Sequence, residues 1–177
     1  LHSNKVNNTN IRVVVVTRSL AKAESVLGND SNLSFIESDI TDLSSLDTAC
    51  DYIIHCAAIT SSALMVSMPV ETIGTSYQGT KAMLELAKGN NIKGMVYISS
   101  MEVYGVTTSD MNPVTEDKLG FVSLENVRSS YQEGKRICEL LCTSYASEYG
   151  VKVCTARLAQ TFGAGVSKDE GRIFAQF

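Results

Sequence analysis

The sequence predicts an α/β fold built on a doubly wound parallel sheet with helices on both of its faces. Short β-branched runs alternate with helical segments, and the run Ile11–Val16 is apolar at nearly every position, as in a strand buried on both sides. The 177 residues are 44% hydrophobic and 19% charged, which is the composition of a folded domain and excludes a disordered chain.

Each predicted element is bounded by residues that favour its ends. Ser19 can cap a helix that ends near Leu27, where Gly28 stops it. Pro69 marks the start of a later helix, and Gly150 marks the end of another. The predicted strands are Ile11–Val16, Leu33–Ile36, Asp51–Cys56, Met95–Ser99 and Val151–Leu158. The predicted helices are 20–27, 43–50, 69–88 and 128–149.

Ligands of parallel sheets bind at the carboxyl ends of the strands, so the residues just after each predicted strand are candidate site residues. One connection, residues 106–127, is polar and contains Pro113. It is longer than the ordinary connections of compact domains, and we therefore interpret it as a functional loop.

Ser100, Tyr131 and Lys135 form the strongest candidate catalytic group. Tyr131 and Lys135 are four residues apart at the start of a predicted helix, so their side chains share one face. A tyrosine is a poor base at neutral pH, but a neighbouring ammonium favours the phenolate and lowers the pKa of the hydroxyl, so Tyr131 could act as a general acid/base. Ser100, at the end of a predicted strand, can hydrogen-bond the same substrate oxygen. Alone, a Tyr and a Lys at this spacing are a weak signal, because many helices carry them by chance.

The surrounding motifs resemble the extended short-chain dehydrogenase/reductases, which are the NAD(P)-dependent epimerases and dehydratases of nucleotide sugars. Six matches fall in the family's order, and the resemblance covers essentially the whole chain from residue 11. They are Asp39-Ile40, His55 to Ala58 (HCAA), Pro69 to Thr80, Val96 to Gly105 (VYISSMEVYG), Tyr131 with Lys135, and Arg157 to Gly163 (RLAQTFG). Together they are far more specific than any one of them, and they imply a Rossmann-like fold.

This resemblance implies roles for the candidate catalytic residues. Tyr131 would be the acid/base, Lys135 would lower its pKa and hold the nicotinamide ribose, and Ser100 would bind the reacting sugar oxygen. Reactions of the family begin with hydride transfer from the sugar to nicotinamide. The transient keto-sugar is then epimerised, dehydrated or decarboxylated, so the resemblance implies oxidoreductase chemistry within an isomerase or a lyase.

Glu102 distinguishes among these outcomes. It matches the glutamate of nucleotide-sugar dehydratases and UDP-glucuronate decarboxylases, in which a second carboxyl group could move a proton on a carbon next to the ketone. Met101 stands where some dehydratases carry an aspartate acid. The alternative interpretation of Glu102 is a solvated glutamate at a strand end.

The resemblance also implies an NAD(P) cofactor, held by Tyr131, Lys135, Arg18, Asp39, Ile40, Ala57 and Ala58. Asp39 and Ile40 match the pair that contacts adenine, and Ala57 and Ala58 match strand-end residues beside the cofactor. Arg18 follows the first predicted strand, where an acidic residue would bind the ribose 2′-hydroxyl of NAD. Its guanidinium can pair with a 2′-phosphate, so we expect NADP; the alternative is a surface arginine.

No GxxGxxG turn occurs in the sequence, although this fold uses such a turn after its first strand to cradle the pyrophosphate. The matches begin at what should be the second strand. We therefore expect residues 1–177 to be a partial NAD(P)-binding domain that lacks its first strand–helix unit and the C-terminal substrate domain. By itself it should be inactive. Without the missing central strand, Ile11–Val16 and Asp51–Cys56 would lack their common neighbour.

The remaining expectations concern partners and compartment. The net charge of −4 argues against non-specific nucleic-acid binding, and no apolar run is long enough to cross a bilayer. The five cysteines form no CxxC pair, which favours free thiols in the cytoplasm and predicts no metal site. We interpret His55, Cys138 and Cys142 as core residues.

By resemblance, we expect a nucleotide-sugar substrate and a homodimer formed through the helix that carries Tyr131. Two other functions stay open. The chain could belong to a non-catalytic NAD(P)-binding regulatory protein, or to a reductase of small carbonyl compounds on the same scaffold.

Overall fold

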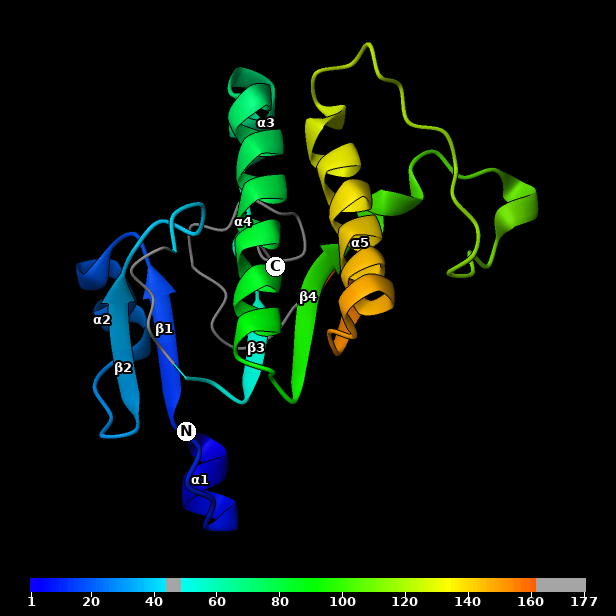
Figure 1. The fold of residues 1–177 in the computed structure, drawn as a ribbon. Coiled ribbons are helices and arrows are strands. Elements are labelled where there is room, and N and C mark those ends of the chain that lie inside the picture. The colour runs from blue at the N-terminus through cyan, green and yellow to red at the C-terminus, as the bar shows by residue number, and fades with distance from the viewer. Residues whose placement is uncertain (44–48, 162–177) are drawn as a thin grey trace.

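The computed structural model describes residues 1–43 and 49–161. Within them, five parallel strands form two separate sheets (Figure 1). The first sheet pairs β1 (Val13–Thr17) with β2 (Leu33–Glu37). The second sheet orders β3 (Tyr52–His55), β4 (Gly94–Ser100) and β5 (Val153–Leu158) side by side. All five predicted strands are therefore confirmed, with small shifts at their ends.

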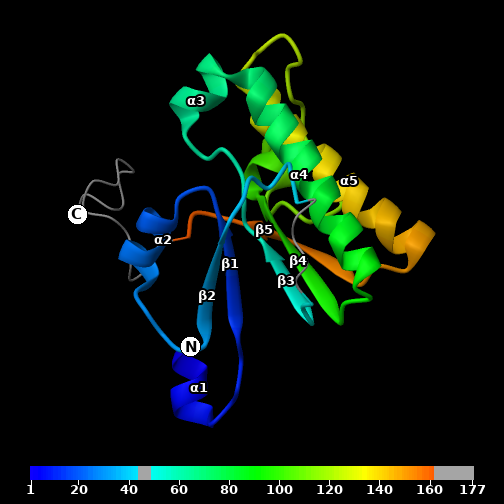
Figure 2. The same ribbon diagram turned by 60° about the vertical axis from the view of Figure 1, so that its left-hand side comes forward.

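The two sheets are not hydrogen-bonded to each other through β1 and β3, and no described strand lies between them (Figure 2). This is the arrangement that the sequence predicts for two strands without a common neighbour. The prediction that these strands are buried on both faces is wrong for the described residues. Val14 on β1 is 41% exposed and Ile54 on β3 is 71% exposed. Within residues 1–43 and 49–161, β1 and β3 each keep one edge without a strand partner, and the long helices cover one face of the second sheet.

The helices follow the predicted caps closely. The Ser19 hydroxyl accepts a hydrogen bond from the Lys22 backbone N–H at 3.4 Å, and Gly28 ends the helix with a φ of 67°. The structure has α1 (His2–Asn7), α2 (Leu20–Leu27), α3 (Ser62–Ser67), α4 (Pro69–Gly89) and α5 (Ser129–Tyr149). The helix predicted over 43–50 falls mostly outside the described residues. None of the described helices is long and apolar enough to span a bilayer.

The core lies where α4 and α5 pack side by side on the second sheet (Figures 1 and 2). Its most buried large side chains include Leu84 of α4 and Met95 and Tyr97 of β4. Cys138 and Cys142 of α5 are buried among them, as predicted. The helices approach closely, since the Cys138 thiol donates a hydrogen bond to the Ser76 carbonyl at 3.1 Å.

His55 at the end of β3 is a core histidine, as predicted. It is 3% exposed, and its Nε2 lies 3.0 Å from the Thr80 hydroxyl of α4. Burial, assisted by the charge of Lys135, lowers the pKa of His55 to about 4, so the imidazole is neutral at physiological pH.

Candidate active site

Ser100, Tyr131 and Lys135 meet at the carboxyl end of β4, beside the start of α5. Ser100 is the last residue of β4, and its hydroxyl is near enough to Tyr131 to lower the pKa of the tyrosine. Tyr131 and Lys135 lie in the first turns of α5 and are 8% and 3% exposed. The Lys135 ammonium donates a hydrogen bond of 2.8 Å to the Ile98 carbonyl of β4 and lies 5.7 Å from the centre of the Tyr131 ring. The structure thus brings together the three side chains that the sequence singles out.

The pKa of Tyr131 departs from the expectation. Burial raises the pKa of Tyr131, the hydrogen bond with Ser100 lowers it, the Glu102 carboxylate raises it and the Arg128 guanidinium lowers it. Burial has the largest effect, so the pKa of Tyr131 lies above its ordinary value in this structure. The Lys135 ammonium donates its hydrogen bond to the backbone of β4, and a lowering of the pKa of Tyr131 by Lys135 stays a prediction.

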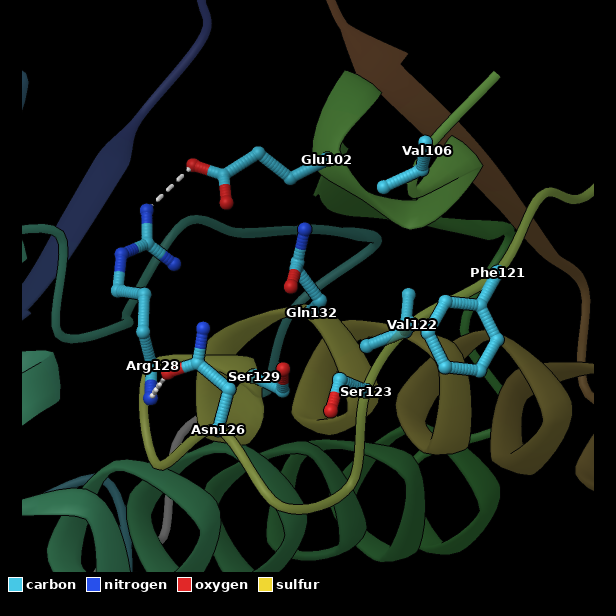
Figure 3. Close-up of a pocket in the computed structure, with 9 residues that line it drawn as sticks. All are labelled: Glu102, Val106, Phe121, Val122, Ser123, Asn126, Arg128, Ser129 and Gln132. Atoms are coloured by element: carbon cyan, nitrogen blue, oxygen red, sulfur yellow. Dashed lines mark hydrogen bonds and ion pairs between the residues drawn. The ribbon is translucent and has the colours of Figure 1, made fainter. Parts of the chain in front are cut away.

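A pocket of about 380 Å³ is lined by Glu102 and by residues at the start of α5, but not by Ser100, Tyr131 or Lys135 (Figure 3). It lies between the start of α5, the 3₁₀ helix η1 (Met101–Tyr104) and part of the segment 106–127. The residues that line it are Glu102, Val106, Phe121, Val122, Ser123, Asn126, Arg128, Ser129 and Gln132. The segment interpreted as a functional loop therefore supplies much of the pocket wall.

Glu102 is not a free, solvated glutamate in this structure. Its Oε1 accepts a hydrogen bond of 2.9 Å from Nη2 of Arg128, and its side chain is 32% exposed (Figure 3). The sequence predicts Arg128 only as the start of a helix and gives no signal for this contact, which joins residues 26 positions apart.

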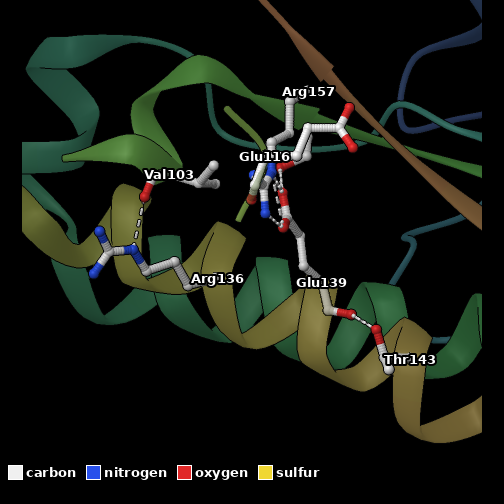
Figure 4. Close-up of polar contacts among 7 residues, drawn as sticks. Val103, Glu116, Arg136, Glu139, Thr143 and Arg157 are labelled. Carbon is white, nitrogen blue, oxygen red and sulfur yellow. Dashed lines mark hydrogen bonds and ion pairs between the residues drawn. The ribbon is translucent and has the colours of Figure 1, made fainter. Parts of the chain in front are cut away.

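Two arginines fix the segment 106–127 that forms the pocket wall. The first is Arg157 on β5, which forms an ion pair with Glu139 of α5 (Figure 4). Its Nη2 donates a hydrogen bond of 2.7 Å to Oε2 of Glu139, and its Nε donates one of 3.1 Å to Oε1. Its Nη1 donates a hydrogen bond of 2.8 Å to the Glu116 carbonyl of the segment. The Ser99 hydroxyl of β4 donates to the same Glu139 carboxylate at 2.6 Å. This network joins β4, β5 and α5 to the segment.

The second is Arg136 on α5. Its Nε donates a hydrogen bond of 2.8 Å to the Val103 carbonyl of η1 (Figure 4). Its Nη2 donates one of 2.8 Å to the Gly120 carbonyl. A Cβ at Gly120 would lie 2.0 Å from the Val106 carbonyl oxygen, so only glycine fits this close approach. The helix that carries Tyr131 and Lys135 therefore also holds the pocket wall.

The residues expected to bind a cofactor lie at the carboxyl ends of β1, β2 and β3. Arg18 follows β1 and is exposed, and Asp39 follows β2 and is also exposed. The Asp39 carboxylate accepts hydrogen bonds from the Thr41 hydroxyl at 2.7 Å and from its backbone N–H at 2.8 Å. These bonds, with a smaller contribution from the Arg18 charge, lower the pKa of Asp39.

Ile40 and the two alanines occupy different surroundings. Ile40 is half-buried against α4 at Gly79, where a Cβ would lie 2.9 Å from its Cγ2. Ala57 is exposed and Ala58 is half-buried just beyond β3. Ile40 therefore packs against α4, whereas the small Ala57 side chain is exposed beyond the end of β3.

The comparisons with known proteins agree with this architecture. The model of the NAD dependent epimerase/dehydratase family matches residues 3–177. UDP-glucuronic acid decarboxylase 1 of Danio rerio is 35% identical over 127 residues, which cover 72% of this chain and 30% of that protein. The chain therefore spans less than a third of that relative.

Two solved structures share the fold. The UDP-N-acetylglucosamine 4-epimerase of Methanobrevibacter ruminantium M1, in complex with UDP-N-acetylmuramic acid, has a TM-score of 0.72 and 25% identity, covering 92% of this chain and 59% of that one. The UDP-glucuronic acid 4-epimerase of Bacillus cereus, in complex with NAD, has a TM-score of 0.71 and 25% identity. The match covers 89% of this chain and 51% of that one. With the family match over nearly the whole sequence, these findings show that the chain belongs to the NAD-dependent epimerase/dehydratase family.

Proposed function

We propose that the whole protein modifies a nucleotide sugar in an NAD(P)-dependent reaction through a transient keto-sugar, and that residues 1–177 form part of its cofactor-binding domain. The observation that carries the proposal is the meeting of Ser100, Tyr131 and Lys135 at the carboxyl end of β4, with Glu102, two residues after Ser100, in the wall of a pocket. Within this class we favour decarboxylation of a nucleotide-linked uronic acid, because Glu102 matches that group and the similar Danio rerio protein is a UDP-glucuronic acid decarboxylase.

The described residues suit a nicotinamide cofactor at two places. Lys135 has three N–H donors and uses one on Ile98, so a buried ammonium with spare donors is available to ribose hydroxyls. The small side chains of Ala57 and Ala58 allow a ligand to approach the end of β3 closely. When bound, the cofactor accepts a hydride from the sugar and can return it.

The chain's own residues handle the protons. As a phenolate, Tyr131 takes the proton of the sugar hydroxyl that becomes the ketone, and the tyrosine hydroxyl gives one back if the ketone is reduced. Ser100 hydrogen-bonds the same oxygen. In a decarboxylation, the bond between the carboxylate and the carbon next to the ketone breaks, CO₂ leaves, and that carbon takes up a proton. Glu102, at the pocket wall, is the group we assign to this carbon.

Incubation of the whole protein with NAD⁺ or NADP⁺ and UDP-glucuronic acid, followed by NMR of the product and trapping of CO₂, tests the proposal. We expect a UDP-pentose and one CO₂ for each substrate consumed. An epimer without CO₂ would keep the class and overturn decarboxylation. Turnover of small carbonyl compounds alone would indicate a reductase, and cofactor binding without any turnover would indicate a regulatory protein.

Glu102→Gln separates the two halves of the reaction. We expect product formation to fall by about 10²-fold or more, because the proton transfer at the carbon next to the ketone is lost. The first oxidation, followed by the near-ultraviolet absorbance of the reduced cofactor in a single turnover, should persist. Glu125→Gln, at an exposed glutamate of the segment 106–127, is the control and should change neither step. An equal loss of both steps would contradict the assignment.

We propose NADP as the preferred cofactor, supported by the exposed guanidinium of Arg18 at the carboxyl end of β1. Arg18→Ala is expected to weaken NADPH binding by about tenfold and to leave NADH binding unchanged, because only NADPH carries the 2′-phosphate. Calorimetric titration of the whole protein with each cofactor measures this. Arg12→Ala, at the other end of β1, is the control, and equal losses for both cofactors would exclude the assignment.

We propose that the whole protein forms a homodimer through the outer face of α4 and α5. Apolar side chains are exposed along this face: Ile73 and Tyr77 on α4 are 47% and 39% exposed, and Ile137 and Leu140 on α5 are 41% and 60% exposed. Leu140→Glu is expected to convert a dimer to a monomer in sedimentation velocity. Leu124→Glu, at a residue that is 83% exposed outside this face, should remain dimeric. A dimer that survives Leu140→Glu would overturn the proposed interface.

A further inference from the structure

One guanidinium lies between the two groups to which acid/base work is assigned. The Nη2 of Arg128 is 2.9 Å from Oε1 of Glu102 (Figure 3). The Cζ of Arg128 is 5.7 Å from the centre of the Tyr131 ring. The side chains of Arg128 and Glu102 are 26% and 32% exposed, so solvent screens this pair only partly.

Both partners are held by their backbones. Arg128 comes directly before α5, and its N–H donates a hydrogen bond of 3.0 Å to Oδ1 of Asn126 (Figure 3). Glu102 lies in η1, and its N–H donates a hydrogen bond of 3.2 Å to the Ser100 hydroxyl. The ion pair therefore connects the end of β4, which carries Ser100, to the start of the helix that carries Tyr131.

The guanidinium keeps unused hydrogen-bonding capacity. Its Nη1 is buried and has no hydrogen-bond partner among residues 1–43 and 49–161. Glu102 thus takes only part of what Arg128 can donate, and the remaining cationic edge is available to a second anion in the pocket.

Two anions must share this small volume if Tyr131 works as a base. A Tyr131 phenolate and the Glu102 carboxylate repel each other, and burial opposes the phenolate as well. The groups that act on Tyr131 are Ser100 of β4, Glu102 of η1 and the Arg128 guanidinium just before α5. The Lys135 ammonium of α5 lies 5.7 Å from the centre of the Tyr131 ring. The other buried hydroxyl nearby, Tyr97 of β4, has its pKa raised by burial and stays protonated.

We propose that Arg128 is a positioning residue that fixes Glu102 at the pocket and compensates its charge, so that Glu102 and Tyr131 can be anionic together. The inference rests on the proposed function, because it concerns the acid/base groups of that reaction. The pKa of Tyr131 points the same way, since Glu102 raises it and Arg128 lowers it.

Direct titration of Tyr131 in the whole protein tests this without substrate. The chemical shift of ¹³Cζ-labelled tyrosine, assigned by loss of the signal in Tyr131→Phe, reports ionisation of the hydroxyl. Arg128→Gln should raise the titration midpoint of Tyr131 by about one pH unit or more, because the Glu102 charge is then uncompensated. Glu102→Gln should lower this midpoint, and the double variant should bring it back towards the value of the parent protein. Arg128→Lys keeps the positive charge, so its midpoint should stay near that of the parent protein.

The outcomes are separable from those of the functional assay. A midpoint unmoved or lowered in Arg128→Gln, with native circular dichroism, overturns the role of Arg128 even if the protein decarboxylates its substrate. The predicted shifts in a protein that turns over no nucleotide sugar would support the inference and reject the function. If Arg128→Gln does not fold, Arg128→Lys and Glu102→Gln decide, because opposite or absent shifts in both contradict charge compensation.

Discussion

Tyr131→Phe is expected to reduce the turnover of a nucleotide sugar by the whole protein by about 10²–10⁴-fold, which is the usual contribution of a positioned acid/base. Phenylalanine keeps the ring, which is 8% exposed, and removes only the hydroxyl. The fold and the Lys135 contact with Ile98 should therefore persist. Initial rates of product formation at saturating cofactor measure the effect.

The control for this variant lies on the same helix. Tyr149→Phe removes a hydroxyl from a ring that is 46% exposed at the far end of α5, and it should leave the rate unchanged. Cofactor affinity should be similar in both variants. A Tyr131→Phe protein that retains the parent rate would remove Tyr131 from the acid/base role and would favour a proton path through Glu102 and solvent.

Arg157→Met is expected to lower the free energy of unfolding by about 2 kcal/mol, between the cost of breaking a buried ion pair and that of breaking an exposed one. The Arg157 and Glu139 side chains are 19% and 15% exposed, so the substitution leaves a poorly solvated carboxylate with Ser99 as its remaining hydrogen-bond donor. Arg157→Met also removes the hydrogen bond from Arg157 to the Glu116 carbonyl in the segment 106–127. Urea denaturation measures the loss.

Two further variants test the cause. Lys93→Ala breaks an ion pair with Asp51 whose side chains are 65% and 67% exposed, and it should leave the urea midpoint unchanged. Arg157→Met combined with Glu139→Met removes both charges and should cost less than Arg157→Met alone, because no carboxylate is stranded. If Arg157→Met is as stable as Lys93→Ala, the contacts of Arg157 with Glu139 and Glu116 contribute nothing to the free energy of unfolding.

The order of strands and long helices could be predicted because local signals carry it. The Ser19 cap, the Gly28 stop and Pro69 at the start of α4 act within a few residues of themselves. The missed helix α3 has no such pattern: its short run of Ser, Met and Val reads equally well as a loop, and Ser61 caps it only through a hydrogen bond of 3.5 Å. Burial of β1 and β3 was mispredicted because it depends on neighbours, which an apolar run does not reveal.

The candidate site was predictable in its residues and less so in its electrostatics. Ser100, Tyr131 and Lys135 follow from a strand end and a helical spacing. The pairing of Glu102 with Arg128, across 26 positions, depends on how η1 and α5 pack, so no short motif predicts it. The pKa of Tyr131 likewise depends on the depth of burial, which the spacing to Lys135 does not give.

The gap in hydrogen bonding between β1 and β3 has a consequence for handling the protein. Among the residues that the structure describes, each of these strands has one edge without a strand partner, next to exposed apolar side chains such as Val14 and Ile54. Such edges recruit strands from other molecules. Any form of the protein in which they stay open will be prone to β-mediated aggregation, and a strand seated between them would both complete the sheet and keep the protein dispersed.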